Sequence, residues 1–335
     1  MTGGTLAKRA LYHSGLLALA RLARQRVRGL VLRYHVLTDG TAEIPYATPE
    51  ICLPVDAFRL QMAFVRRAYR VVSVDDVIDA LANGRPLPPR ALAITFDDGY
   101  ADNHRLGLPV LRRLGLPATI YVATGGLDGG TPMWTSAVRA LVLAAPGPVL
   151  DVPGMGTVTI GPPGRRHDGV RALTRALVPL AAGDRQARLD AAARSAGVDV
   201  GGLLAGAMLT RAAVRELAAS GWTIGAHTVS HINVALADPA EAEAEIAASR
   251  DALVAAAGTR VVHFAYPNTG GQHRYFSAEV IAILRRLGFR SAVISRSGAL
   301  RPGLDPFTIP RLGVSPRLGS VIELATAMER QRLAA

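Results

Sequence analysis

The stretch ALAITFDDGYADN, residues 91–103, decides how the rest of the chain is interpreted. Its first six residues are almost all apolar and predict a buried strand. The strand ends in two adjacent carboxylates, Asp97 and Asp98, followed by Gly99. Because Asp and Gly are turn-forming residues, a simple turn or helix cap would explain these three positions alone. Their meaning therefore depends on the other strand ends.

Short β-branched runs alternate with longer helical patterns after residue 28. We expect strands at 30–36, 69–74, 91–96, 118–123, 222–226, 261–266, 291–295 and 307–312. Helices are expected at 55–67, 74–82, 104–114, 210–220, 239–257 and 277–287. This order predicts an α/β protein of parallel β/α units, either closed into a barrel or open. Since no phosphate-binding glycine fingerprint follows an early strand, we favour a parallel (β/α) barrel of about seven to eight strands.

The chain length and composition suit one large domain with an insertion. The 335 residues are 50% hydrophobic, enough for a large core. Residues 146–169 are rich in Pro and Gly and precede an Ala/Arg-rich helical stretch. We expect a single barrel domain, 29–335, with a helical insertion at about 131–209 over one mouth of the barrel.

Residues 1–28 show Leu and Arg at helical spacing and predict a basic amphipathic helix. Such a helix packs on its own domain or makes peripheral contact with a membrane surface. The segment resembles neither a signal peptide nor a membrane span. These features predict a cytoplasmic protein or one associated with the inner face of a membrane.

The formal net charge of +12 comes from 38 basic and 26 acidic residues spread along the chain. No basic block with interleaved aromatic residues and no zinc-finger pattern is present, so we expect no nucleic-acid partner. The lone cysteine, Cys52, excludes an internal disulfide and a cysteine-based zinc site. Histidine and carboxylate groups remain as ligands for any metal.

Reactive side chains recur at the ends of the expected strands. In a parallel barrel, the C-terminal ends of all strands meet on one face, where such enzymes build their active sites. We expect the following side chains to converge there: His35, Asp97, Asp98, His227, His231, Tyr266 and Asn268.

His227 and His231 are four residues apart, a spacing that places two imidazoles on one face of a helical turn. With an aspartate from a neighbouring strand end they would form a facial set that leaves positions open for water and substrate. Zinc is the default ion, and cobalt, nickel, manganese or iron could use the same ligands. Consecutive side chains diverge, so one of Asp97 and Asp98 is expected to bind the ion and the other to act as general base.

The motifs TFDDGYADN, GWTIGAHTVSH and FAYPNTG together resemble the polysaccharide deacetylases, the NodB-homology group of carbohydrate esterase family 4, in particular their FAYP-type branch. The resemblance spans about residues 31–314. It implies a distorted (β/α) barrel and a metal-dependent removal of N-acetyl groups from amino-sugar polymers. It also implies ligand roles for Asp98, His227 and His231, with Asp97 as the base that takes a proton from metal-bound water.

Further site residues follow from this resemblance and from its departures. An oxyanion-binding backbone N–H would fall near Asn268, beside Tyr266. Ala265 occupies the place of an Arg that braces the base in relatives, and Arg311 of a late Pro-Arg pair is expected to replace it. The Leu-x-x-His motif that supplies an acid in relatives is absent, so His35 is either the general acid or a structural residue. Trp134 is either a sugar-stacking platform or an anchor of the insertion.

We therefore expect a metal-dependent N-deacetylase that acts on an N-acetylated glycan or glycoconjugate. One alternative is an amidase for a small linear or cyclic amide, and another is a non-catalytic carbohydrate-binding protein. The shape of the site, set largely by residues 131–209, distinguishes the two enzymes.

Overall fold

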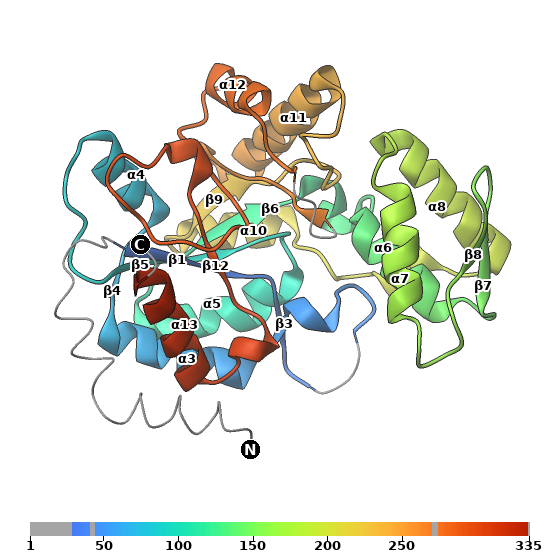
Figure 1. The fold of residues 1–335 in the computed structure, drawn as a ribbon, viewed down its shortest axis with the longest axis horizontal. Helices are drawn as coiled ribbons and strands as arrows, with labels where there is room; N and C mark the ends of the chain where they lie inside the picture. The colour runs from blue at the N-terminus through green and yellow to red at the C-terminus, as the bar shows by residue number, and fades with distance from the viewer. Residues whose placement is uncertain (1–28, 41–43, 270–273, 334–335) are drawn as a thin grey trace.

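A curled sheet of parallel strands forms the centre of the molecule (Figure 1). The structure is a computed structural model that describes residues 29–40, 44–269 and 274–333. Seven strands lie side by side in the order β11 (Ser291–Val293), β10 (His263–Ala265), β9 (Thr223–Ala226), β6 (Thr119–Val122), β5 (Ala91–Phe96), β1 (Gly29–Tyr34) and β12 (Leu312–Gly313). An eighth, β4 (Arg70–Val71), pairs with the start of β5.

The segment before β12 connects the two edges of the sheet. Ile309 accepts a hydrogen bond from the Ile294 N–H, at 2.8 Å, just after β11. Three residues later, Leu312 pairs with Leu32 of β1. One stretch of chain thus contacts both edge strands in turn, and the sheet forms a distorted barrel, which confirms the expected fold class.

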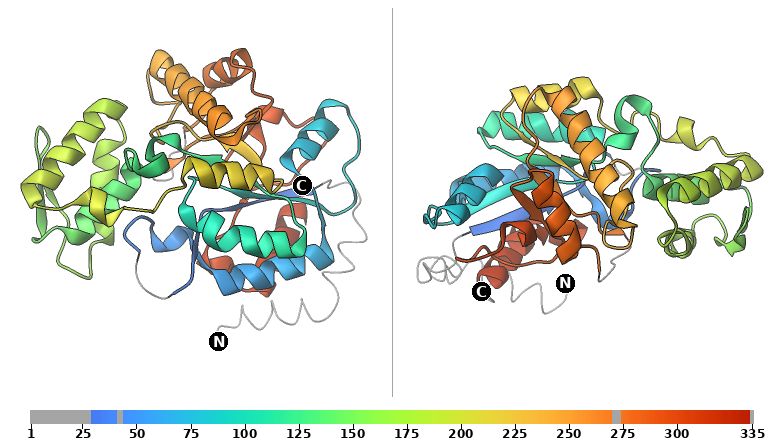
Figure 2. Two further views of the ribbon diagram at one scale, coloured as in Figure 1. Left: turned by 180° about the vertical axis from the view of Figure 1, so that it is seen from behind. Right: turned by 90° about the horizontal axis from the view of Figure 1, so that it is seen from above.

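Helices cover the outside of this sheet (Figures 1 and 2). They are α3 (Val55–Ala68), α4 (Val74–Ala82), α5 (Leu108–Leu114), α10 (Arg211–Ala219), α11 (Pro239–Ala257), α12 (Ala278–Arg286) and α13 (Val321–Leu333). A π-helical turn at Asn103–Gly107 precedes α5. Local signals set these bounds: Ser73 and Asp76 form a capping box at α4, and Gly258 ends α11 in the left-handed conformation.

Two expected strands contribute only two residues each to the sheet. The segment 307–312 forms a 3-10 turn, Pro306–Thr308, and contributes only Leu312–Gly313 to the sheet. Prolines 306 and 310 have no N–H to donate to a ladder, which explains the short strand. The run at 69–74 likewise contributes only β4, because helix α4 begins at Val74.

Alternate residues of each strand face the inside of the barrel. The interior-facing positions are small or slender: Val31, Ala93, Ala265 and Val293 pack with Tyr121 in one cluster. Their neighbours, such as Leu32 and Ile94, pack under the surrounding helices. A residue two positions after an interior-facing residue lies on the same face of its strand. Near the end of a strand, such a residue therefore points into the C-terminal mouth of the barrel.

A separate group of helices and a hairpin lies to one side of the sheet (Figures 1 and 2). It comprises α6 (Trp134–Ala144), the antiparallel pair β7 (Val149–Val152) and β8 (Gly156–Thr159), α7 (His167–Leu177), α8 (Ala182–Ala196) and α9 (Val200–Leu203). These elements share a hydrophobic cluster of their own. They fall within the expected insertion, whose bounds of 131–209 stay a prediction. A second parallel pair, β2 (Val36–Thr38) with β3 (Cys52–Pro54), follows β1.

The expected amphipathic helix at 1–28 and its membrane contact lie outside the described residues. Within 29–40, 44–269 and 274–333, no helix has the length and apolar character needed to cross a membrane.

Candidate metal centre and active site

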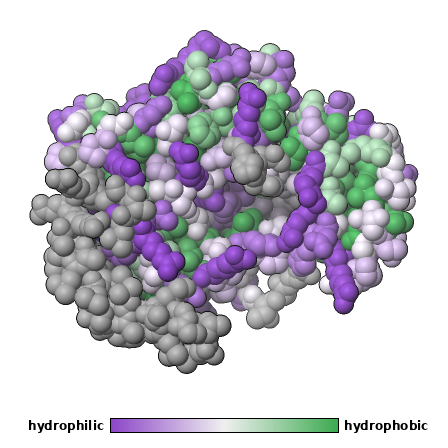
Figure 3. Space-filling model, in the orientation of Figure 1, coloured by the Kyte–Doolittle hydropathy of each residue, from purple (hydrophilic) through white to green (hydrophobic). Residues whose placement is uncertain are grey.

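The C-terminal ends of the parallel strands open into one cavity of about 880 Å³. His35 follows β1, Asp97 and Asp98 follow β5, and His227 follows β9. The cavity lining includes these four residues, together with His231, Tyr266 and Asn268. Seen from the side of Figure 1, the surface is hollowed near the centre, with hydrophilic side chains around the hollow (Figure 3). The expected convergence of strand ends is therefore present in the structure.

Asp98, His227 and His231 form a compact, buried donor cluster. The Asp98 Oδ1 lies 3.3 Å from His227 Nε2 and 3.4 Å from His231 Nε2. One donor atom from each residue lies within 4.8 Å of the other two. His227 Nδ1 is 2.7 Å from the Ala265 carbonyl oxygen, to which it donates, so Nε2 keeps its lone pair for an ion. Two imidazoles and one carboxylate in this arrangement fit a divalent transition-metal ion.

The charge state of Asp98 suits a metal ligand. Burial by itself would raise its pKa, but the neighbouring His227 and His231 side chains lower it more. The net result is a pKa well below the usual range, so the carboxylate is ionised at neutral pH.

The backbone at this cluster is strained at three positions. Asp98, Thr228 and His231 have φ angles of 75°, 66° and 56°, in the left-handed region that non-glycine residues rarely adopt. Such strain is typical of functional sites held by their surroundings. The histidine pair lies on a loop between β9 and α11, past the end of the strand as expected, and not on a helical turn. The left-handed residues bring the two imidazoles together, with ring centres 4.9 Å apart.

A carboxylate that the sequence did not single out holds this loop. Glu245 of α11 accepts hydrogen bonds from the Val229 and Ser230 N–H groups, at 2.8 and 2.9 Å, and from the Ser230 hydroxyl, at 2.6 Å. On the other side, the Trp134 indole N–H donates to the His231 carbonyl, at 3.1 Å. Glu245 lies in the run EAEAEI, whose three glutamates offer no signal that separates this one from the others.

Asp97 forms a buried bidentate pair with Arg311. The distances are 2.6 Å from Nη1 to Oδ1 and 2.7 Å from Nη2 to Oδ2. Arg311 is fully buried and also donates to the Thr95 hydroxyl and the Ile294 carbonyl. Burial alone would raise the pKa of Asp97, but the Arg311 guanidinium lowers it more and keeps the carboxylate ionised. Arg311 thus lies where a residue that braces Asp97 must lie.

His35 lines the cavity but is a poor proton donor. Burial lowers its pKa to about 4, so the imidazole is neutral at neutral pH. Its Nδ1 is buried without a hydrogen-bond partner among the described residues. Because a general acid must carry its proton at the working pH, these surroundings oppose the expected acid role.

Trp134 does not line the cavity, which favours the anchor of the insertion over the sugar-stacking platform. Its side chain is buried, and the Arg185 guanidinium lies over the ring, 4.4 Å from the ring centre. The indole N–H is used by His231, which makes Trp134 an anchor. The Tyr266 hydroxyl is also already used, since it donates to the Phe307 carbonyl at 3.1 Å. Asn268 lines the cavity, with a buried Oδ1 that has no hydrogen-bond partner in the described chain.

The cavity also contains arginines that the sequence analysis missed. Arg33 lies two positions after interior-facing Val31 and two before His35, and this alternation was the signal that could have placed it. Arg171 and Arg175 reach the same cavity from α7.

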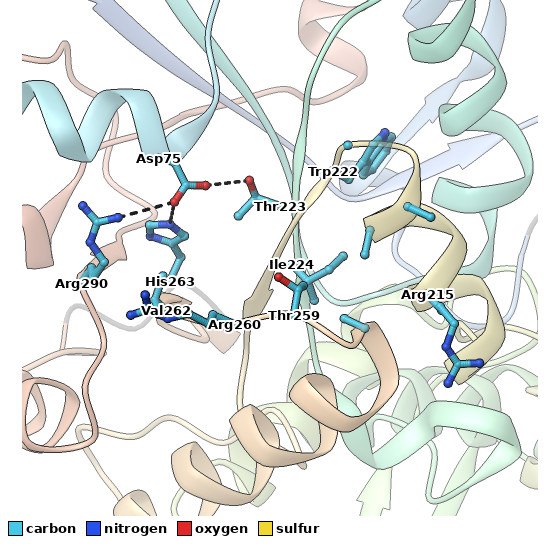
Figure 4. Close-up of a pocket in the computed structure, with 14 residues that line it drawn as sticks. Asp75, Arg215, Trp222, Thr223, Ile224, Thr259, Arg260, Val262, His263 and Arg290 are labelled. Carbon is cyan, nitrogen blue, oxygen red and sulfur yellow. Dashed lines mark hydrogen bonds and ion pairs between the residues drawn. The ribbon is translucent and has the colours of Figure 1, made fainter.

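A second hollow of about 510 Å³ lies at the N-terminal ends of the strands (Figure 4). There Asp75 binds His263 at 2.9 Å, Thr223 at 3.0 Å and Arg290 at 3.7 Å. These contacts connect α4 to the starts of three strands, and such bonds at the bottom face of a barrel serve stability. Both nitrogens of His263 have partners, because Nδ1 contacts the Ser291 hydroxyl. Among the described residues, the only three-residue group with metal-ligand geometry is the Asp98 cluster.

Comparisons with known proteins agree with this site. Residues 84–144 and 182–292 match the family model for polysaccharide deacetylases. A segment of 90 residues is 30% identical to the poly-beta-1,6-N-acetyl-D-glucosamine N-deacetylase of Escherichia coli K12; it covers 27% of this chain and only 13% of that relative.

Two solved structures share the fold. The Streptococcus pyogenes deacetylase PplD, in complex with acetate, has a TM-score of 0.62 at 18% identity and covers 91% of this chain and 99% of its own. IcaB from Ammonifex degensii has a TM-score of 0.58 at 19% identity, and the match covers 91% of this chain and 98% of IcaB. The family model spans more than half of the chain and includes both the Asp-Asp strand end and the histidine loop. The chain therefore belongs to the polysaccharide deacetylases, a family of hydrolases that act on carbon–nitrogen bonds other than peptide bonds.

Proposed function

We propose that this protein is a metal-dependent hydrolase that removes N-acetyl groups from an N-acetylated amino-sugar glycan or glycoconjugate. One observation carries the proposal: the Asp98–His227–His231 donor cluster lies in the same cavity as an ionised carboxylate, Asp97. The names of the similar proteins support it, since one is an N-deacetylase of a poly-N-acetylglucosamine and another was solved with acetate.

Asp98, His227 and His231 would hold the ion, most suitably Zn²⁺, with Co²⁺, Ni²⁺, Mn²⁺ or Fe²⁺ as alternatives. When bound, a divalent ion polarises a carbonyl and makes a water molecule more acidic. Asp97 accepts the proton from the attacking water, and Arg311 keeps Asp97 ionised and fixes its orientation. The backbone near Asn268 would donate to the oxyanion of the tetrahedral intermediate. His35, neutral at working pH, offers a hydrogen bond rather than a proton.

The insertion contributes a wall of the cavity through Thr135 of α6 and Thr174 of α7. The cavity volume of about 880 Å³ lies in the upper part of the range that is typical of ligand-binding sites. This size favours a sugar over a small amide as the substrate. We infer that residues 131–209 shape the substrate groove.

The test is acetate release from β-1,6- and β-1,4-linked N-acetylglucosamine oligomers and from a simple methyl glycoside, with small linear and cyclic amides alongside. Each assay is run with a chelator and after Zn²⁺ is restored, and Asp97→Asn serves as the inactive control. We expect acetate from the sugars, abolished by the chelator and restored by the ion. Hydrolysis of the amides alone would favour the amidase alternative, and binding without hydrolysis would favour the carbohydrate-binding one.

A further inference from the structure

Arg33 places a cation inside the barrel, on the floor of the cavity. Its strand register sets it opposite Thr95 on one side and Gly313 on the other. Gly313 makes room for it, because a Cβ at that position would lie 2.8 Å from Arg33 Nη2. The guanidinium therefore lies against the Gly313 backbone and faces the cavity that contains Asp97 and Asp98.

The carboxylates near Arg33 already have other partners. Asp97 is bound on both oxygens by Arg311, and Asp98 belongs to the histidine cluster. Burial and the Arg311 charge lower the pKa of Arg33, while Asp97 and Asp98 raise it. Within the described chain no side-chain hydrogen bond or ion pair holds Arg33, and its Nε is buried without a partner.

Other buried arginines in this protein show what a structural role looks like. Arg166 donates to the carbonyls of Val142 and Leu143, at 2.7 and 2.8 Å. Arg185 donates to the Leu180 carbonyl at 2.6 Å, among others. Arg33 has no such carbonyl among the described residues, so its donors remain available to the cavity. A half-buried guanidinium without protein partners takes its hydrogen bonds from cavity water or from a ligand.

The insertion adds positive charge to the opposite wall. On α7, Arg171 is opposed by Glu50 and Asp168, at 3.4 and 3.5 Å. Arg175 lies one turn further along the helix, and its Nε–H donates a hydrogen bond to the Arg171 carbonyl. No carboxylate of the described chain pairs with Arg175. The cavity thus has one unneutralised arginine on its floor and another on its wall.

We propose that the substrate is an anionic amino sugar, one that carries a phosphate or carboxylate group which Arg33 binds, with Arg175 at the cavity wall. This inference rests on the proposed deacetylase function and names its substrate class. Guanidinium groups bind phosphate and carboxylate in the same bidentate way, with two N–H groups that donate to two oxygens of the anion. The feature that the two kinds of substrate share is therefore a pair of negatively charged oxygens.

The test compares three monosaccharides: N-acetylglucosamine 1-phosphate, N-acetylmuramic acid and the neutral methyl N-acetylglucosaminide. We expect at least one anionic sugar to show a KM about ten-fold or more below that of the neutral one, as befits charge-assisted hydrogen bonds. Arg33→Met should reduce this selectivity ratio about ten-fold, mainly through KM. Gly313→Ala, which displaces the guanidinium without removing it, should reduce the ratio in the same direction.

The matched control is Arg215→Met, which removes the same charge at the second hollow, at the other end of the barrel. It should leave the selectivity ratio unchanged. Equal KM values for anionic and neutral sugars in the wild type, or equal losses in Arg33→Met and Arg215→Met, would overturn the inference while the deacetylase proposal stands.

If no sugar releases acetate, the deacetylase proposal itself is refuted. The inference about Arg33 is then tested by measuring sugar binding. Calorimetry on Asp97→Asn, with and without Arg33→Met, measures the affinity for the same three sugars. Tighter binding of an anionic sugar that disappears with Arg33→Met supports the inference. Indifference to the charge of the sugar refutes it.

Discussion

Removal of Arg311 should destabilise the protein strongly, and more so as the pH rises. Arg311 is fully buried, Asp97 is 3% exposed, and two hydrogen bonds of 2.6 and 2.7 Å join them. In Arg311→Met the carboxylate remains buried without its partner, which costs about 3–5 kcal/mol in the free energy of unfolding. This is a large part of the total stability of a typical protein, about 5–15 kcal/mol.

The pH dependence of this loss follows from the pKa of Asp97. In the native protein that pKa is depressed, so the pair contributes stability above the unfolded pKa of about 3.9, and the contribution is lost as the pH falls through the folded pKa. In Arg311→Met the main influence that lowers the pKa is lost, while the effect of burial, which raises the pKa, remains. The difference between wild type and variant should therefore be larger at pH 8 than at pH 5.

Urea denaturation of the metal-free protein at both pH values measures this difference. The control is Arg286→Met, which breaks a bidentate pair with Glu243 of 3.2 and 2.7 Å on the surface and should leave stability nearly unchanged. In the active enzyme, the acidic limb of the kcat/KM profile should move to higher pH in Arg311→Met. A loss no larger than that of the control, or a profile that does not move, would refute the assignment of Arg311 as the group that keeps Asp97 ionised.

Four further variants test the site. Asp98→Ala and His227→Ala should each lose bound metal as well as activity, and a metal content equal to wild type by elemental analysis would contradict their role as ligands. Asp97→Asn should keep the metal but lower kcat by about 10²–10⁴-fold, whereas near-normal acetate release would eliminate Asp97 as the base. Glu245→Gln weakens the support of the histidine loop and should raise the Kd for Zn²⁺ by about ten-fold or more, measured by competition with a chelating dye. An unchanged Kd would show that the loop keeps its shape without this carboxylate.

Elements with strong local signals were predicted almost to the residue. The strand Ala91–Phe96 and the helices Val74–Ala82 and Pro239–Ala257 have the predicted bounds. In each helix a capping residue, Ser73 or Asp238, binds the first free N–H groups, which is a local interaction visible in the sequence. Alternatives stayed open in the sequence where neighbours in space decide the outcome.

Trp134 is one such case. A tryptophan next to a loop could be exposed or buried, and only the packing of Arg185 and His231 around it decides. The histidine pair is a second case. Its spacing suited a helix, but hydrogen bonds to Glu245 and two left-handed residues, Thr228 and His231, hold it as a loop. His35 is a third case. Burial determines the pKa of its imidazole, and burial is a property of the folded barrel.

The sequence by itself determined the alternation of strands and helices, and with it the strand ends at which the reactive side chains appear. Hydrophobic periodicity and capping act over a few residues, and the parallel barrel then gathers the strand ends on one face. Only the tertiary structure decided the partner of each side chain. Arg311 binds Asp97 from 214 residues away, and Arg33 faces the cavity without a described partner of its own. Partners and burial set the charge and pKa of a group, and both arise from the packing of segments that are distant in the chain.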